Sequence, residues 1–133
     1  MAVSIVFLDR DTLPARIALP APAFAHHWQE YPATSPEQVV PRLQDATMAI
    51  VNKVRIGEAE LAALPQLRLI AVAATGTDNV DLEAATKAGV CVMNTPGQNA
   101  NAVAELALGM MVYAVRNFYN GTSGTELDRK SVV

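Results

Sequence analysis

The feature that most constrains the fold of this chain is an alternation of short apolar runs with helix-like segments. Apolar runs of this length are typical of buried strands, and strands that alternate with helical patterns are typical of α/β proteins with a parallel sheet. The polar run HHWQEY is the weakest strand candidate. The predicted strands cover residues 3–8, 27–31, 47–51, 67–74 and 90–93.

The clearest helix start lies between the second and third predicted strands. Ser35 is expected as the N-cap, Pro36 occupies the first helical position, and Gln38 follows the cap by three residues. Pro41 lies inside this helix and predicts a kink or an early restart.

Two further helices are expected at 58–64 and 80–88. Asp78 or Asn79 is predicted to cap the second of them, and Gly89 to terminate it. Five strands with intervening helices favour a flavodoxin-like, doubly wound parallel sheet with strand order 2-1-3-4-5. The fourth strand is apolar on both faces, as a central parallel strand that is covered on both sides should be.

The last predicted helix, residues 101–116, is apolar on every side. A helix of this kind must be buried all round, so we expect it to meet another domain or a second subunit, and we predict a homodimer through it. The following residues are rich in Gly, Ser and Thr. We therefore predict a domain at 1–100, an interdomain or dimerisation helix at 101–117, and a linker or truncated tail at 118–133.

Composition narrows the class of protein. The 133 residues are 51% apolar, enough for a sizeable core, and the net charge of −3 argues against a nucleic-acid partner. We expect no secretory signal and no membrane span, and hence a cytoplasmic protein. Cys91, the single cysteine, is expected to be a buried, inert thiol, and His26 and His27 to be surface or half-buried histidines.

Several chemistries are excluded at the predicted strand ends. The first strand is followed by DRDTLP, which has no glycine and carries two carboxylates, so it does not suit a flavin phosphate. Asn52 and Asn94 stand where a phospho-receiver domain needs Asp and Lys. No Gly-x-Gly-x-x-Gly occurs, so the chain has no dinucleotide-binding fingerprint, and no metal site is predicted.

The loop after the fourth strand is the most informative local feature. Gly76 permits a sharp turn, and the backbone amides of Thr75, Gly76 and Thr77 are able to converge on an anion. The helix that follows adds the positive end of its dipole. A ligand that bears a carboxylate would suit this loop, although most such glycines serve geometry alone.

Three blocks of sequence resemble the D-isomer-specific 2-hydroxyacid dehydrogenase family. They are TGTDNVDL at 75–82, GVCVMNTPGQN at 89–99, and VAE at 103–105. The earlier part, with NKV at 52–54, is most similar to the glycerate dehydrogenase (hydroxypyruvate reductase) branch, and the later part to the phosphoglycerate dehydrogenase-like branch. The resemblance covers nearly the whole chain.

The resemblance implies roles for residues at matching positions. The amides of Thr75, Gly76 and Thr77 would hold the substrate carboxylate, and Lys53 would attract the acid into the same cleft. Asn99 and Val103 would approach the nicotinamide of the NAD(H) or NADP(H) cofactor.

The same resemblance implies that the catalytic Arg, Glu and His lie in a cofactor domain with no counterpart in these residues. We therefore expect no hydride transfer by this chain alone, and a sheet face that is uncovered or covered by a partner. The alternatives are a free-standing module that binds small 2-oxo or 2-hydroxy acids, and a dimerisation module.

Overall fold

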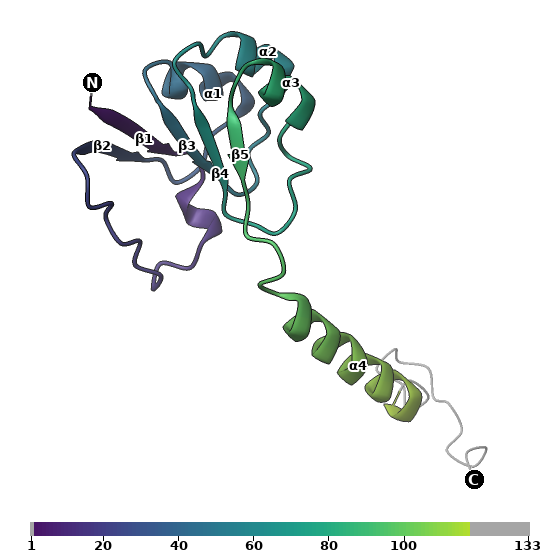
Figure 1. Cartoon of the computed structure of the whole chain (residues 1–133). Coiled ribbons are helices and arrows are strands. Elements are labelled where there is room, and N and C mark those ends of the chain that lie inside the picture. The colour runs from purple at the N-terminus through teal and green to yellow at the C-terminus, as the bar shows by residue number, and fades with distance from the viewer. Residues whose placement is uncertain (1, 118–133) are drawn as a thin grey trace. The chain divides into compact units, whose positions relative to one another are not determined.

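The computed structural model describes residues 2–117, which separate into two compact units, Met1–Pro96 and Gly97–Val133. The predicted tail at 118–133 lies outside the described residues. The first unit is an α/β domain whose sheet joins residues far apart in sequence (Figure 1).

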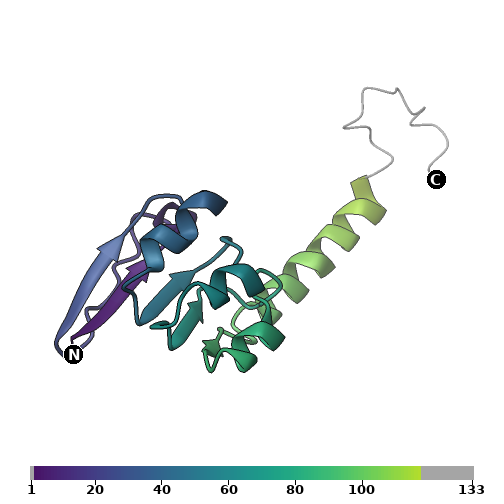
Figure 2. The ribbon, with the colours of Figure 1, turned by 90° about the horizontal axis from the view of Figure 1, so that it is seen from above.

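The sheet is entirely parallel and has the order β2-β1-β3-β4-β5. Seen from above, the strands follow one another in this order (Figure 2). The predicted topology is therefore confirmed. The strands are β1 (Val3–Phe7), β2 (His26–Glu30), β3 (Met48–Val51), β4 (Leu69–Val72) and β5 (Cys91–Met93).

Three helices follow β2, β3 and β4 in turn, and a 3₁₀ turn, Arg10–Thr12, follows β1. They are α1 (Pro36–Leu43), α2 (Glu58–Ala62) and α3 (Leu82–Lys87). Ser35 is the N-cap of α1, as predicted, and its amide donates to Gln38 Oε1 at 3.1 Å. The expected restart at Pro41 does not occur, because α1 runs through it to Leu43.

The cap of α3 corrects the sequence-based expectation. The helix begins at Leu82, and the Asp81 carboxylate accepts from the amide of Ala84 at 2.9 Å, so neither Asp78 nor Asn79 is the cap. Both of those residues lie earlier, in the loop that bounds the site described below. Gly89 ends α3 as predicted, with a φ of 72° that suits glycine.

The main core lies between α1–α3 and one face of the sheet. Side chains of all three helices join one buried cluster with alternate residues of the central strands. Since successive strand residues point to opposite faces, the remaining residues belong to the other face. The helix-facing strand residues are Val6, Ala49, Val51, Ile70 and Val72.

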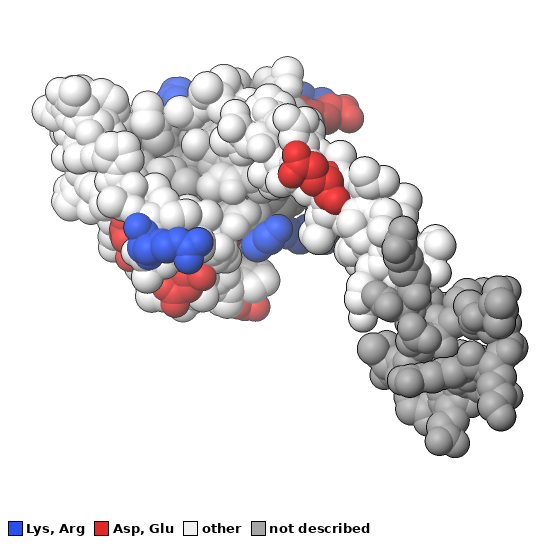
Figure 3. Space-filling view, turned by 90° about the horizontal axis from the view of Figure 1, so that it is seen from below, with Lys and Arg blue, Asp and Glu red and all other residues white. Residues whose placement is uncertain are grey.

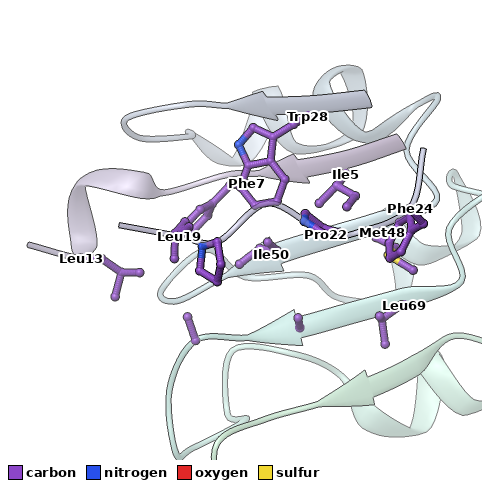
Figure 4. A pocket seen from close by; sticks show the side chains of 14 residues that line it. Ile5, Phe7, Leu13, Leu19, Pro22, Phe24, Trp28, Met48, Ile50 and Leu69 are labelled. Atoms are coloured by element: carbon purple, nitrogen blue, oxygen red, sulfur yellow. The ribbon is translucent and has the colours of Figure 1, made fainter. Parts of the chain in front are cut away.

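The opposite face borders an apolar pocket of about 430 Å³ instead of a helix layer. Phe7, Ile50 and Trp28 of the sheet and Leu19 and Pro22 of the segment between β1 and β2 point into it (Figure 4). The expectation that both faces of β4 are covered is therefore wrong for this face, where its residues are only half-buried.

Cys91 is exposed, which corrects the prediction of a buried thiol. It opens β5, the strand at one edge of the sheet, where the side chains of Cys91 and Met93 are both exposed. An edge strand has a neighbour on one side only, so an apolar run there does not guarantee burial. His26 is half-buried and His27 exposed, as expected.

The second unit contains α4 (Ala100–Asn117). Its large apolar side chains are exposed, by 52% to 78% of their surface. Among the described residues, no helix is both long and apolar enough to cross a membrane. The exposed apolar side chains of α4 are Val103, Leu106, Leu108, Met110, Met111, Val112, Tyr113 and Val115.

Candidate anion-binding pocket

A polar pocket of about 380 Å³ lies at the carboxyl ends of β3 and β4. In open parallel sheets, ligands bind beyond this edge. Lys53 and Gly76, which the sequence analysis assigned to one site, both line the pocket. The full lining is Asn52, Lys53, Arg55, Ala74, Gly76, Asp78 and Asn79.

The Asp9 carboxylate holds one wall of the pocket in place. Asp9 follows β1, is 3% exposed, and reaches across to the loop after β3. Its Oδ2 accepts from the amides of Lys53 at 2.6 Å and Val54 at 3.0 Å, and its Oδ1 accepts from the amide of Asn52 at 2.9 Å. A buried carboxylate is stable only when it is hydrogen-bonded in this way. The sequence did not indicate this role, because Asp9 and the amides that it accepts from are 43 to 45 residues apart.

The loop after β4 forms the other wall. The carbonyl of Thr75 accepts from Asn94 Nδ2 at 2.7 Å, and the carbonyl of Ala74 accepts from the amide of Thr95 at 3.1 Å. Within residues 2–117, no hydrogen bond uses the amide of Thr75, Gly76 or Thr77 as its donor. The loop is therefore anchored through its carbonyls, which leaves three amides to receive an anion.

Gly76 does not have a positive φ, and a larger residue at this position would displace the exposed side chain of Asp78. Positive φ values occur at Gly89 and Gly97 among the described glycines, not at Gly76. A Cβ built on Gly76 would lie 2.9 Å from Asp78 Oδ1, too close for a real contact. Thr75 is exposed and Thr77 half-buried; they flank Gly76 without lining the pocket.

Arg55 is a lining residue that the sequence analysis did not single out. Asn79 joins the residues on either side of Arg55 to the opposite wall. Its side-chain Nδ2 donates to the carbonyl of Val54, and its backbone carbonyl accepts from the amide of Ile56, both at 2.9 Å. The spacing of Arg55 from Lys53 in the sequence could have indicated that Arg55 lines the pocket. In an extended segment, Arg55 lies on the same side as Lys53.

The pocket brings two cations, Lys53 and Arg55, together with one carboxylate, Asp78. Its formal charge is therefore +1, which favours a small anion. Figure 3 shows that the basic and acidic side chains on the face seen from below lie in small separate groups and do not form one continuous charged patch.

The two residues predicted to approach a cofactor belong to the second unit, so the pocket contains neither. Val103 donates its amide to the Asn99 carbonyl at 2.8 Å in the first turn of α4, and both side chains are exposed. They offer a surface to pack against, but no glycine loop for a pyrophosphate. Residues 2–117 also contain no cluster of side chains suited to a metal ion.

The fold and the pocket define a flavodoxin-like α/β domain with a polar pocket of positive formal charge at the carboxyl ends of its strands. The family profile described as D-isomer specific 2-hydroxyacid dehydrogenase, catalytic domain, matches residues 18–131. The chain belongs to this family, as the three sequence blocks predicted.

Individual relatives agree with this assignment. The chain is 44% identical to the glycerate dehydrogenase of Methylorubrum extorquens over 117 residues. This alignment covers 87% of this chain and 36% of that protein. It is 37% identical over 112 residues to human D-3-phosphoglycerate dehydrogenase, covering 74% of this chain and 21% of the relative. The chain thus spans about a third or less of the length of these curated relatives.

Solved structures share the fold. The NAD⁺-bound 3-phosphoglycerate dehydrogenase of Entamoeba histolytica superposes with a TM-score of 0.68 at 30% identity, over 96% of this chain and 44% of that chain. A glyoxylate reductase from Paecilomyces thermophila gives a TM-score of 0.70 at 20% identity, over 89% of this chain and 39% of that chain, and supports the fold alone.

Proposed function

We propose that this chain is the substrate-binding part of an NAD(P)-dependent D-2-hydroxyacid dehydrogenase of the hydroxypyruvate/glycerate type. The observation that carries the proposal is the pocket in which Lys53 and the loop of Gly76 meet. The names of the glycerate and phosphoglycerate dehydrogenase relatives support the substrate class.

The pocket suits a 2-oxo or 2-hydroxy carboxylate. The amides of Thr75, Gly76 and Thr77 would donate to the carboxylate oxygens, and charge-assisted bonds of this kind are the stronger ones. Lys53 would raise the local concentration of the acid through its charge. Asp9 would act as a positioning residue, since it fixes the backbone from which Lys53 projects.

The proposal assigns no catalytic residue to these 133 residues. Hydride transfer to a 2-oxo acid needs a cofactor and a proton donor, and by resemblance the catalytic Arg, Glu and His lie outside them. Residues 1–100 would form the substrate-binding domain, 101–117 the interdomain or dimerisation helix, and 118–133 the linker. Asn99 and Val103 would contact the cofactor.

A titration of the 133-residue chain followed by amide NMR tests this function. Hydroxypyruvate is expected to shift the resonances of Thr75, Gly76, Thr77 and Lys53, whereas NADH is expected to shift none. Lys53→Ala should weaken binding of hydroxypyruvate about two- to fivefold, the range of an exposed ion pair. Lys87→Ala, on α3, is the matched control.

Two outcomes would contradict the proposal. A dispersed spectrum that does not respond to hydroxypyruvate would remove the substrate site. Oxidation of NADH by the pure 133-residue chain with hydroxypyruvate, lost in a Gly76→Ala variant, would show that the catalytic centre lies within these residues.

A second candidate is a dimerisation module. The exposed apolar side chains along α4 favour it. A binding domain responds to added acid, whereas a dimerisation module responds only to protein concentration.

A further inference from the structure

Lys53 and Arg55 lie on the same side of an extended segment that follows β3. Val54 is half-buried against the core and Ile56 is 1% exposed, whereas Lys53 and Arg55 are both exposed. This alternation has the two-residue period of an extended chain, in which residues i and i+2 share a face. Both cations line the same pocket.

The backbone beneath the two cations is anchored at both ends. Asp9 accepts from the amides that lead up to Val54, and Asn79 bonds to the chain on both sides of Arg55. Ile56 also accepts from the amide of Asp81 at 3.0 Å. Since the backbone is already ordered, binding an anion here does not add the cost of ordering the loop.

The pocket contains a second cation, Arg55, beyond the one assigned to the substrate carboxylate. The loop amides and Lys53 suffice for one carboxylate, and neither of the two ion pairs among residues 2–117 involves Lys53 or Arg55. Asp78 is the one carboxylate in the lining. Asp78 repels any anion, so a second anionic group adds to the affinity only where it lies close to the Arg55 guanidinium.

We propose that Arg55 is a specificity-determining residue that selects an acid with a second anionic group at the end remote from its carboxylate. This inference rests on the function proposed above and narrows its substrate class. The guanidinium has a planar fork of donors that matches a phosphate or a carboxylate. A ligand such as glycerate leaves Arg55 exposed to water, whereas a three-carbon or four-carbon acid with a second anionic group pairs with it.

The test compares D-glycerate, D-malate and 3-phospho-D-glycerate by amide NMR titration of the 133-residue chain. The phosphorylated acid is expected to bind about fivefold more tightly than D-glycerate, the upper range for an exposed ion pair. Arg55→Gln should remove most of this gain, and Asp78→Asn should increase it. Lys87→Gln carries the same loss of charge outside the pocket and should leave the gain unchanged.

D-malate separates the two sources of the second charge. A gain shared by malate supports recognition of any remote anion, and a gain confined to the phosphorylated acid supports recognition of phosphate. Equal affinities for glycerate and the phosphorylated acid, or a gain that survives Arg55→Gln, would overturn this inference and leave the proposed function standing. If no acid shifts the resonances of residues 75–77, the proposed function itself fails.

Discussion

A single buried carboxylate, that of Asp9, joins the ends of β1 and β3 where the pocket opens. It accepts from the amides of Asn52, Lys53 and Val54, and it is the one polar side chain among the described residues that is fully buried. Burial of an unpaired charge is expensive, so these bonds both stabilise the domain and fix the wall that carries Lys53.

Asp9→Asn should lower the free energy of unfolding by about 2–3 kcal/mol, the scale of hydrogen bonds to a charged group. The substitution removes the charge and places an amide donor among backbone donors. Urea unfolding followed by circular dichroism measures the effect. Asp11→Asn is the matched control, because Asp11 is exposed, and it should change stability little. Equal losses in the two variants would refute the role given to Asp9.

At the scale of elements, α3 connects the pocket loop to the edge strand. Its N-cap is Asp81, and at its end the amide of Val90 donates to the carbonyl of Ala85 while that of Gly89 donates to Thr86. This pair of bonds is the Schellman arrangement, which needs a left-handed residue and explains Gly89. Asp78 is thereby left free to line the pocket.

Asp81→Ala should cost about 1 kcal/mol of stability through loss of the cap, whereas Asp78→Ala should cost less than about 0.5 kcal/mol. Thermal unfolding of the two variants distinguishes them. The reverse ranking would mean that α3 is capped by Asp78, as the sequence pattern alone suggested.

At the scale of the whole molecule, two apolar surfaces stand out, each in its own unit. The first unit has the apolar pocket on the sheet face, with the exposed Phe24 in its lining, and the second has α4. Apolar surface of this extent on a small domain usually marks contact with a partner. In a longer protein of this family, both surfaces would be available to further domains or subunits.

We predict that the chain dimerises through α4. Light scattering at high micromolar concentration should give the mass of a dimer. A Leu106→Gln/Met110→Gln double variant should shift the equilibrium at least about tenfold toward monomer. The reason is that each polar substitution in an interface core costs on the order of 1 kcal/mol. Leu82→Gln, at an exposed leucine outside α4, is the control. A purely monomeric parent chain would disprove the prediction.

The sequence by itself determined the topology, the strand positions to within a few residues, the family and the central glycine of the pocket. These follow from local signals: the period of apolar residues, the turn residues, and short blocks such as TGTDNVD. Lys53 and Gly76 were assigned to one site by the resemblance to the 2-hydroxyacid dehydrogenase family, and the folded sheet brings the ends of their strands to a common edge.

Only the tertiary structure decided which long-range partners complete the site. Asp9 meets amides more than forty residues away, and Arg55 lines the pocket because Asn79 holds its segment there. The exposure of Cys91 likewise depends on β5 being an edge strand. Hydrogen bonds and burial of this kind depend on which segments the folded chain brings together, and no local pattern of residues encodes them.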